Sequence, residues 1–312
     1  PNRLAKSRSP YLKSAARQPV QWFPWGPEAF LEAKRLDRPI LLDIGAAWCH
    51  WCHVIDHESY ENDKIAKMIN DHFVAIKVDR DERPDIDTRY QLAVSALTGQ
   101  GGWPLTAFLT QEGDVFFGGT YFPPEDRYGR PGFKKILRRI SDVYKTKKAE
   151  VYEDAKKIAA VFEESGKPKL TPKEKLGGEL IQSTLYALKH QFDFIHGGLG
   201  NAPKFFHPSA FEFLLNQFFL TRQSWMRSVV EKSLEAMGKG GVFDQLGGGF
   251  HRYSVDERWV VPHFEKMSYD NAALLSLYSK AFQVFGQPLY REVARGITRW
   301  AQETMTEKQG GF

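Results

Sequence analysis

The chain contains few of the residues that mark secreted or membrane proteins. Only two cysteines, Cys49 and Cys52, occur in 312 residues, and one closely spaced pair cannot supply the disulfide framework of a small secreted domain. No uninterrupted apolar run approaches the roughly 20 residues that cross a bilayer. The first 27 residues are basic and free of acidic residues, and they lack the apolar core of a secretory signal. We therefore expect a cytoplasmic protein without a membrane partner.

A concentration of charge of one sign is also missing. The formal net charge is +5, and the 43 basic residues are spread along the chain beside 38 acidic ones. A nucleic-acid-binding protein usually gathers its basic residues in a stripe or carries a reader motif, and neither is present. We therefore expect no nucleic-acid partner. The length is typical of two globular domains of about 150 residues each.

The first half of the chain alternates short apolar runs with amphipathic stretches. Residues 38–46 and 73–81 predict buried strands, and residues 83–97 predict a helix from their apolar spacing. Two further apolar strands, 101–110 and 114–122, are joined by a hairpin-sized turn, and a helix from about Gly132 to Tyr144 follows. The order βαβαββα is that of a thioredoxin fold, in an α/β domain that we place at residues 1–165. The preceding segment PVQWFPWGPEAF is predicted to be an ordered strap on the domain surface.

The second half differs in its sequence pattern, because it has long helical stretches and no strand-like alternation. Residues 166–178, GKPKLTPKEKLGG, predict a linker because they are polar, rich in Lys, Pro and Gly, and lack periodicity. We place an all-α domain at 179–312. Its helical patterns cover 174–192, 208–221, 223–239, 264–285 and 288–306.

Glycine pairs follow several of these helices, as in HGGLG, KGGVF, LGGGF and QGGF, and form a weak internal repeat. Repeated helical hairpins of this kind are typical of an (α/α) toroid, and five helices fall short of closing one. We therefore expect an incomplete toroid domain, truncated from a longer protein, with a small open helical domain as the alternative.

Both cysteines lie in GAAWCHWCHVIDH, directly after a predicted buried strand and at the start of a helical pattern. Unpaired backbone N–H groups and the helix dipole favour an anion there, so we expect the pKa of the Cys49 thiol to fall below the free value of about 8.5. Cys49 is then the nucleophile of a thiol-disulfide oxidoreductase, and Cys52 resolves the mixed disulfide. The expected partner is a protein substrate that bears a thiol or a disulfide, and no cofactor is expected.

Other residues near the cysteines support this hypothesis. Asp43 lies six positions before Cys49 in a buried strand, where its carboxyl can exchange a proton with Cys52. A merely structural aspartate would be costly there. A cis peptide bond is expected where the third strand begins, after a glycine turn. The substrate surface is expected to be formed by Trp48, His50, Trp51, Trp103 and Pro104.

Zinc binding is the main alternative for these cysteines. On a helix, one stripe would carry Cys49, Cys52 and His53 and, less closely, His57. All four are legitimate zinc ligands. Four ligands on one helix cannot easily surround a tetrahedral ion, and no second CxxC or HxxxH motif occurs elsewhere. We favour the redox pair and expect no metal, with inert buried thiols as the third alternative.

Seven motifs spread through nearly the whole chain form a specific set: NRLAKSRSPYL, PVQWFPWGPEAF, GAAWCHWCHVIDHESYEN, VDRDERPDID, GQGGWPLTAFLT, GGTYFPP and HFEKMSYDNA. On these motifs the chain resembles the spermatogenesis-associated protein 20 family. The resemblance implies a thioredoxin-like domain joined to a six-hairpin (α/α) toroid, and a thiol-disulfide enzyme whose toroid is like that of carbohydrate-active epimerases and hydrolases. The chain departs from the family at Ala15, Ala16 and Gln21, within a stretch where family members commonly have His and Asp.

A second group of ionisable residues lies within 240–272, in a loop and the expected first turns of the next helix: Asp244, His251, Arg252, Asp256, Glu257, His263, Glu265 and Asp270. By analogy with (α/α) toroids, these groups would act as general acid and base on a carbohydrate, and Trp259 would stack on a sugar ring. The alternative is a buried polar network of Asp244, Arg252, Asp256 and His263 that holds the loop, with Glu265 favouring the helix start.

Overall fold

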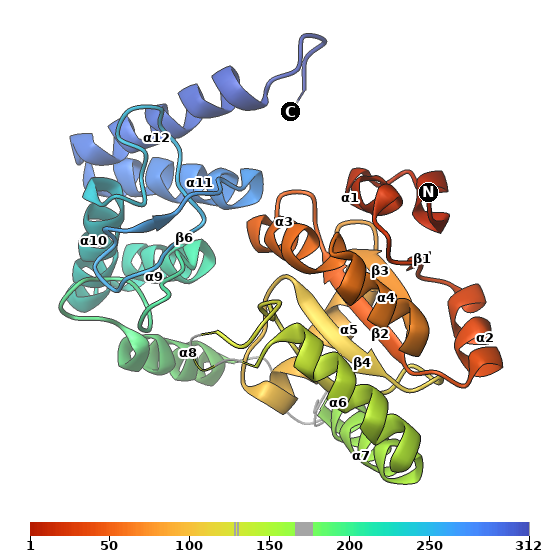
Figure 1. Cartoon of the computed structure of the whole chain (residues 1–312). Coiled ribbons are helices and arrows are strands. Elements are labelled where there is room, and N and C mark those ends of the chain that lie inside the picture. The colour runs from red at the N-terminus through yellow and green to blue at the C-terminus, as the bar shows by residue number, and fades with distance from the viewer. Residues whose placement is uncertain (128, 130, 166–176, 312) are drawn as a thin grey trace. The chain divides into compact units, whose positions relative to one another are not determined.

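The computed structural model describes residues 1–127, 129, 131–165 and 177–311 (Figure 1). Its contacts divide into two compact units, Pro1–Leu170 and Thr171–Phe312, and each is described by itself. The predicted linker at 166–178 lies outside the described residues except for its last two glycines.

A five-stranded mixed sheet forms the centre of the first unit, in the strand order β1-β3-β2-β4-β5. The strands are β1 (Phe23–Pro24), β2 (Ile40–Gly45), β3 (Val74–Asp79), β4 (Leu105–Leu109) and β5 (Val115–Gly119). β3 pairs in parallel with β1 and β2, whereas β4 pairs antiparallel with β2 and β5. This topology is that of thioredoxin, and it confirms the predicted fold of the first half.

Helices cover both faces of this sheet. One face packs against α2 (Pro27–Leu36) and α5 (Pro84–Thr98). The other packs against α3 (His50–Ile55), α4 (Asp63–His72) and α6 (Phe133–Thr146). Short turns η1 (Arg3–Lys6), η2 (Ala15–Arg17) and η3 (Asp56–Tyr60), with helices α1 (Pro10–Ser14) and α7 (Lys148–Ser165), complete the unit. Because both faces are covered, every residue of β2, β3 and β4 is buried.

The N-terminal segment differs from the predicted surface strap. Its strand β1 pairs with β3 at the edge of the sheet, and the Trp22 indole, fully buried, donates a hydrogen bond to Gln18 Oε1 at 2.7 Å. The Asn2 amide donates to the carbonyl oxygens of Ala15 and Val20 at 2.9 and 3.0 Å. A two-residue strand has no period of its own, so only tertiary pairing identifies it.

The second unit is helical, as predicted. Within residues 177–311 the helices are α8 (Gly178–Gln191), α9 (Pro208–Thr221), α10 (Ser224–Lys239), α11 (Ser268–Phe285) and α12 (Pro288–Trp300), with the turn η4 (Ala301–Met305) after them. α9 packs on α10 and α11, and α12 packs on α10 and α11. One short strand pair, β6 (Tyr253–Ser254) with β7 (Pro262–His263), was not predicted. None of the helices in the described ranges combines the length and apolar character needed to span a bilayer.

The glycine loops of this unit form a structural repeat. After α8, Asp193 Oδ1 accepts the backbone N–H groups of Ile195 and His196 at 2.8 and 2.9 Å. Lys204 Nζ donates to Asp193 Oδ2 at 2.6 Å and to the Gly197 carbonyl oxygen at 2.8 Å. We call this arrangement a carboxylate–lysine lock.

A second carboxylate–lysine lock follows α10. Asp244 Oδ1 accepts the backbone N–H groups of Leu246 and Gly247 at 3.0 and 2.9 Å. Lys266 Nζ lies 2.7 Å from Asp244 Oδ2 and 2.7 Å from the Gly248 carbonyl oxygen. The weak glycine repeat in the sequence therefore corresponds to a repeated hydrogen-bonded loop.

Glycine is required within these loops by close packing. Gly198 has φ 83°, and a Cβ at this position would lie 2.4 Å from the Trp259 ring. Any other residue would combine left-handed backbone strain with a steric clash.

Candidate redox site

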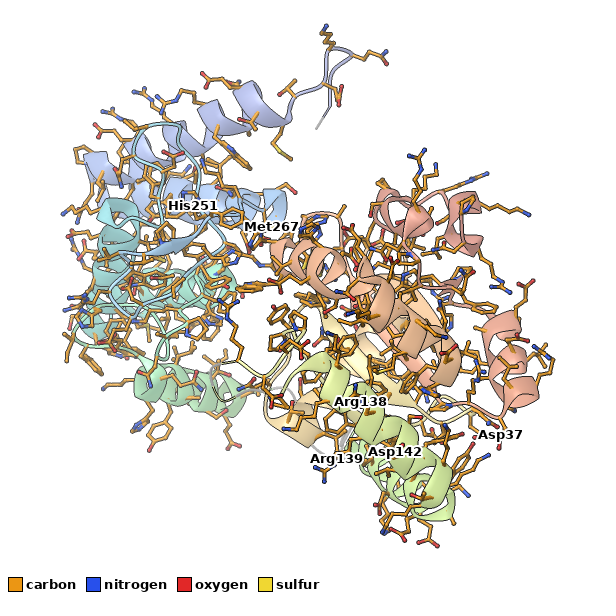
Figure 2. All side chains as sticks on the ribbon, viewed as in Figure 1. Asp37, Arg138, Arg139, Asp142, His251 and Met267 are labelled. Atoms are coloured by element: carbon orange, nitrogen blue, oxygen red, sulfur yellow. A yellow bond between two sulfur atoms is a disulfide. The ribbon has the colours of Figure 1, made fainter. Side chains whose placement is uncertain are left out.

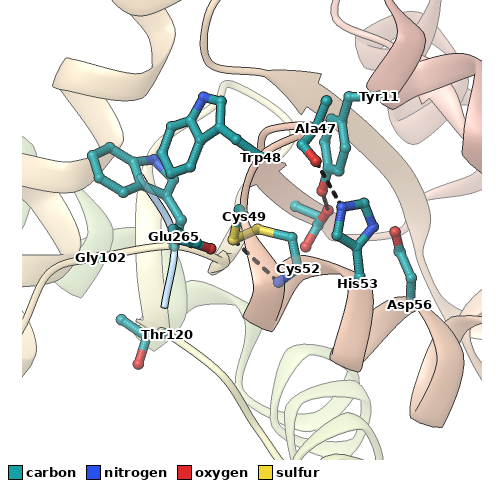
Figure 3. The surroundings of a disulfide bond; sticks show 12 residues. Tyr11, Ala47, Trp48, Cys49, Cys52, His53, Asp56, Gly102, Thr120 and Glu265 are labelled. Carbon is teal, nitrogen blue, oxygen red and sulfur yellow. Dashed lines mark hydrogen bonds between the residues drawn. A yellow bond between two sulfur atoms is a disulfide. The ribbon is translucent and has the colours of Figure 1, made fainter. Parts of the chain in front are cut away.

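Cys49 and Cys52 form a disulfide at the start of α3 (Figure 3). Cys49 is the N-cap residue of this helix, and its sulfur accepts the backbone N–H of Cys52 at 3.1 Å. A backbone donor directed at this sulfur stabilises negative charge on it when the pair is reduced. Cys52 lies in the first turn of the helix and is fully buried. The strand, cysteine and helix arrangement matches the prediction from the sequence.

The register of β2 and β3 places a charged pair beneath the cysteines. Asp43 and Lys77 are directly opposite one another on neighbouring strands, so their side chains leave the same face of the sheet. Lys77 Nζ lies 2.7 Å from Asp43 Oδ2, and both side chains are fully buried. Lys77 was missed by sequence reasoning, although its position inside the apolar run 73–81 was the same kind of signal that identified Asp43.

Three more side chains complete the buried cluster. Asp56 Oδ1 lies 2.9 Å from Lys77 Nζ, and the hydroxyls of Tyr11 and Tyr60 donate to Asp43 Oδ2 and Oδ1, each at 3.1 Å. Asp56 begins the π-helical turn η3 that directly follows α3, and such turns recur at functional sites. Tyr11 comes from a segment that is distant along the chain, whereas Asp56 lies within the cysteine motif itself and was overlooked by sequence reasoning.

Burial controls ionisation in this cluster. It raises the pKa of Asp43 above its usual range, the opposite charge of Lys77 limits the rise, and the like charge of Asp56 adds to it. It also raises the pKa values of Tyr11 and Tyr60 well above their usual range, with the charge of Asp43 as the next cause. Asp43 therefore accepts a proton more readily than a surface aspartate, and both phenols stay neutral.

The tryptophans predicted at the substrate surface are held by the VDRDERPDID segment. Trp48 Nε1 donates to Asp81 Oδ2, and Trp103 Nε1 donates to Asp87 Oδ1, each at 2.8 Å. The Arg80 guanidinium lies over both rings, 5.7 and 4.8 Å from their centroids. Acidic and basic residues of this motif therefore fix the orientation of the two indoles.

The remaining surface candidates lie beside them. Trp51 is 44% exposed, with its ring 5.7 Å from that of His50, also exposed, and 5.0 Å from that of Tyr121. The Trp103–Pro104 peptide bond is cis, as predicted from the fold context. Whether these residues bind substrate stays a prediction.

The histidines of the zinc alternative have other partners. His53 Nε2 lies 2.7 Å from the Ala47 carbonyl oxygen, and His57 Nδ1 lies 3.0 Å from Glu61 Oε2. Within the described ranges no three His, Cys, Asp or Glu side chains are placed to share a metal ion.

Residues 1–163 match the family Thioredox_DsbH, described as "Protein of unknown function, DUF255". The chain belongs to this family. Over its full length it is 38% identical to mouse and 40% identical to human spermatogenesis-associated protein 20, and it spans 40% of the length of each. The resemblance drawn from the motifs is therefore confirmed.

Solved structures resemble parts of this Thioredox_DsbH chain. A protein titled DsbH oxidoreductase is 18% identical, with a TM-score of 0.31, and the match covers 41% of this chain and 86% of that one. The cellobiose 2-epimerase of Spirochaeta thermophila is also 18% identical, with a TM-score of 0.39, over 43% of this chain and 36% of that one.

In the second unit, the structure brings three of the second-site candidates together. Arg252 Nη1 lies 3.4 Å from Glu265 Oε2, and His263 Nδ1 lies 3.6 Å from the same oxygen. Burial raises the pKa of Asp270 to about 6, and the charge of Arg252 limits that rise. The helix α11 begins at Ser268, so Glu265 pairs with Arg252 rather than favouring the helix start as expected.

The other candidates hold local loops. The hydrogen bond from Lys266 and two backbone donors keep the pKa of Asp244 well below its usual range. Asp256 accepts the backbone N–H groups of Arg258 and Val261 at 2.7 and 2.6 Å, and these donors outweigh burial to lower its pKa. Asp244 and Asp256 thus stabilise two separate loops, rather than one network with Arg252 and His263.

His251 and Trp259 are the next two residues of this group, and the structure gives the partners of each. His251 Nδ1, from the residue labelled in Figure 2, lies 2.8 Å from the Phe264 carbonyl oxygen. The Trp259 indole is fully buried and packs parallel to Phe206, with ring centroids 5.8 Å apart. It has no face free for a sugar ring, so its predicted stacking role is wrong.

Proposed function

We propose that this Thioredox_DsbH protein is a thiol-disulfide oxidoreductase acting on a protein disulfide. The observation that carries the proposal is the Cys49–Cys52 disulfide at the start of α3, with the Cys52 N–H directed at the Cys49 sulfur. In the reduced protein, the Cys49 thiolate attacks one substrate sulfur and displaces the other as a thiolate. Cys52, as a thiolate, then attacks Cys49, forms the internal disulfide and releases the second substrate sulfur. The substrate gains two electrons and two protons, and the cysteine pair loses them.

Asp43 is proposed as the group that takes the proton from Cys52. Its buried carboxylate lies among neutral phenols and one ammonium group, and burial raises its pKa towards the range of a useful base. The proposed substrate surface consists of Trp48, His50, Trp51, Trp103 and Pro104. We further propose a cytoplasmic setting, because one CxxC pair is not the disulfide framework of a secreted domain.

The roles of the cysteines are separated by serine variants. With a small disulfide-linked peptide as probe, Cys52→Ser should accumulate a mixed disulfide at Cys49, and Cys49→Ser should lose turnover. Alkylation of the reduced protein should be faster at Cys49 than at Cys52, and faster than for a free thiol at pH 6. Faster reaction at Cys52, or turnover that survives in Cys49→Ser, would contradict the assignment.

A second candidate function is carbohydrate binding by the helical unit. The observation that favours it is the group of Arg252, His263 and Glu265 beside Asp270, whose pKa of about 6 suits a residue that exchanges protons near neutral pH. Titration calorimetry with neutral mono- and disaccharides should show binding that His263→Ala weakens at least tenfold, without sugar turnover. Equal heats for the variant and the parent protein would remove this candidate.

A further inference from the structure

The Tyr11 hydroxyl and the Cys52 sulfur both lie close to Gly45. A Cβ built on Gly45 would lie 2.3 Å from Tyr11 Oη and 2.7 Å from Cys52 Sγ. The sum of these two distances, 5.0 Å, is therefore the largest separation that the hydroxyl and the sulfur can have. The same hydroxyl donates to Asp43 Oδ2 at 3.1 Å. Tyr11 therefore lies near the resolving cysteine and is hydrogen-bonded to the buried carboxylate.

The helix α1 fixes Tyr11 in this place. Ser9 caps α1 by accepting the Leu12 N–H at 3.0 Å, and its hydroxyl donates to Asp79 Oδ2 at 2.5 Å. Lys77 Nζ lies 4.6 Å from the centroid of the Tyr11 ring, a distance at which an ammonium group is attracted to the ring face. The cap of α1 and its hydrogen bond to Asp79 thus position the helix, and Lys77 contacts the Tyr11 ring directly.

The buried cluster has capacity for one additional proton. Asp43, Asp56 and Lys77 together carry a charge of −1 when all three are ionised, and all three are buried. Because burial disfavours net charge, uptake of one proton by the carboxylates brings the cluster to neutrality at a lower cost. The carboxylate that receives the proton from Cys52 therefore belongs to a cluster that becomes neutral by receiving it.

We propose that Tyr11 is a catalytic residue that relays the proton from Cys52 to Asp43. The inference rests on the proposed oxidoreductase function. In the resolving step, the Cys52 thiol gives its proton to Tyr11 Oη, while the Tyr11 hydroxyl gives its own proton to Asp43 Oδ2. The electron pair left on Cys52 forms the bond to Cys49, and the bond from Cys49 to the substrate breaks with its electrons on the substrate sulfur. Tyr11 ends the step neutral and Asp43 ends it protonated.

Tyr60 provides a matched comparison for Tyr11. Both phenols donate to Asp43 at 3.1 Å, but Tyr60 reaches Oδ1, whereas Tyr11 reaches Oδ2 and lies beside Cys52. Tyr11→Phe and Tyr60→Phe each remove one hydroxyl and one hydrogen bond to the same carboxylate. A greater effect of Tyr11→Phe therefore reports the relay rather than the loss of support for Asp43.

Two measurements test the relay in the full chain. In the first, the ultraviolet absorbance of the thiolate follows Cys52 ionisation in reduced Cys49→Ala protein. Tyr11→Phe should move this titration to higher pH, and Tyr60→Phe should move it less.

In the second measurement, release of a peptide from its mixed disulfide with Cys49 should slow by about tenfold or more in Tyr11→Phe, since general acid–base catalysis contributes at least this much. Equal effects of the two variants, or an unchanged Cys52 titration in Tyr11→Phe, would overturn the proposal.

Gly45→Ala tests the same contact without removing a hydroxyl. Its methyl group would force the Tyr11 hydroxyl and the Cys52 sulfur apart, so it should reproduce the Tyr11→Phe shift of the Cys52 titration. A normal titration in this variant would count against the relay. The absorbance titration needs no substrate, so a protein that fails to reduce disulfides would overturn the proposed function and still give a result for the relay.

Discussion

Among the residues that the structure describes, Lys77 and Lys204 are fully buried, one in each unit, and their surroundings differ. Lys77 Nζ contacts the carboxylates of Asp43 and Asp56 at 2.7 and 2.9 Å. Lys204 Nζ contacts the Asp193 carboxylate at 2.6 Å and the carbonyl oxygens of Gly197 and Glu257 at 2.8 and 2.9 Å. The first lysine has two charged acceptors, and the second has one charged and two neutral acceptors.

The charge balance of each site indicates its role. Around Lys204 one carboxylate neutralises one ammonium group, and the three donors of the ammonium each have an acceptor. Such a site has no reason to exchange a proton, so it serves as a structural lock. Around Lys77 the excess carboxylate, close to the cysteine pair, leaves a charge that a proton can neutralise. The same pair of residue types therefore supports structure in one unit and, in the mechanism that we propose, takes part in proton transfer in the other.

The largest effect is expected for Lys204→Met. Removing one partner of a buried ion pair leaves an uncompensated charge, and the free energy of unfolding of the helical unit should fall by about 3–5 kcal/mol. Although burial opposes it, the hydrogen bond from Lys204 lowers the pKa of Asp193 to about 2. A lowered folded-state pKa gives stability that is present above pH ~4 and lost as the pH falls to about 2, so the difference between variant and parent should narrow over that range. Hydrogen exchange of the 178–300 amides, measured from pH 2 to 7, checks this.

Lys266→Met is the matched control for the second carboxylate–lysine lock. Its ion pair with Asp244 is more exposed, with 15% and 29% of the two side chains accessible, so the loss of stability should be only about 1–2 kcal/mol. A loss as large as that of Lys204→Met would show that burial does not distinguish the two locks. Thiol reactivity of Cys49 per folded molecule should be unchanged in both variants.

For Lys77→Met we expect a loss of stability that depends on pH in the opposite direction, together with a chemical effect. Without the ammonium group the pKa of Asp43 rises further, because Lys77 is what limits its rise. A raised folded-state pKa means that stability is fully present below pH ~4 and is lost as the pH rises, the opposite direction to Lys204→Met. A carboxyl that already holds its proton cannot accept another, so the resolving step should slow by about tenfold at pH 7.

The stability of Lys77→Met is measured by urea unfolding at pH 4 and pH 8. The rate of the resolving step is measured by single-turnover kinetics of a mixed disulfide. Equal stability loss at both pH values would mean that Lys77 supports the fold in the same way as Lys204. The distinction drawn here between the two buried lysines would then fail.

Prediction from the sequence succeeded where the signal is local. The helices that begin at Pro208 and Pro288 were predicted at those residues, because proline at the first helical position and an apolar stripe identify a start and a face. Cys49 was placed at a helix start because the preceding strand and the CxxC spacing are continuous in the chain. Asp43 was identified because burying a carboxylate in an apolar strand costs free energy, so a functional role is expected for it.

It failed where a residue's role depends on distant partners. Trp259 resembles a ligand-binding aromatic in the sequence, yet it is buried against Phe206 and Gly198 from another loop. The sequence also grouped Asp244 and Asp256 in one polar network with Arg252 and His263. Hydrogen bonds instead hold each of the two carboxylates in its own loop.

The sequence by itself determined the alternation of strands and helices, the thioredoxin order of the first half, and the position of the cysteine pair. Periodicity, capping and strand length are properties of neighbouring residues, so they can be read along the chain. The tertiary structure alone decided that Asp43 pairs with Lys77 on the neighbouring strand and that the Tyr11 hydroxyl from α1 lies within 5.0 Å of the Cys52 sulfur. Strand register and the docking of an N-terminal helix are set by packing between residues far apart in the chain. The proton path that we propose is built from three such segments, so it depends on the folded protein.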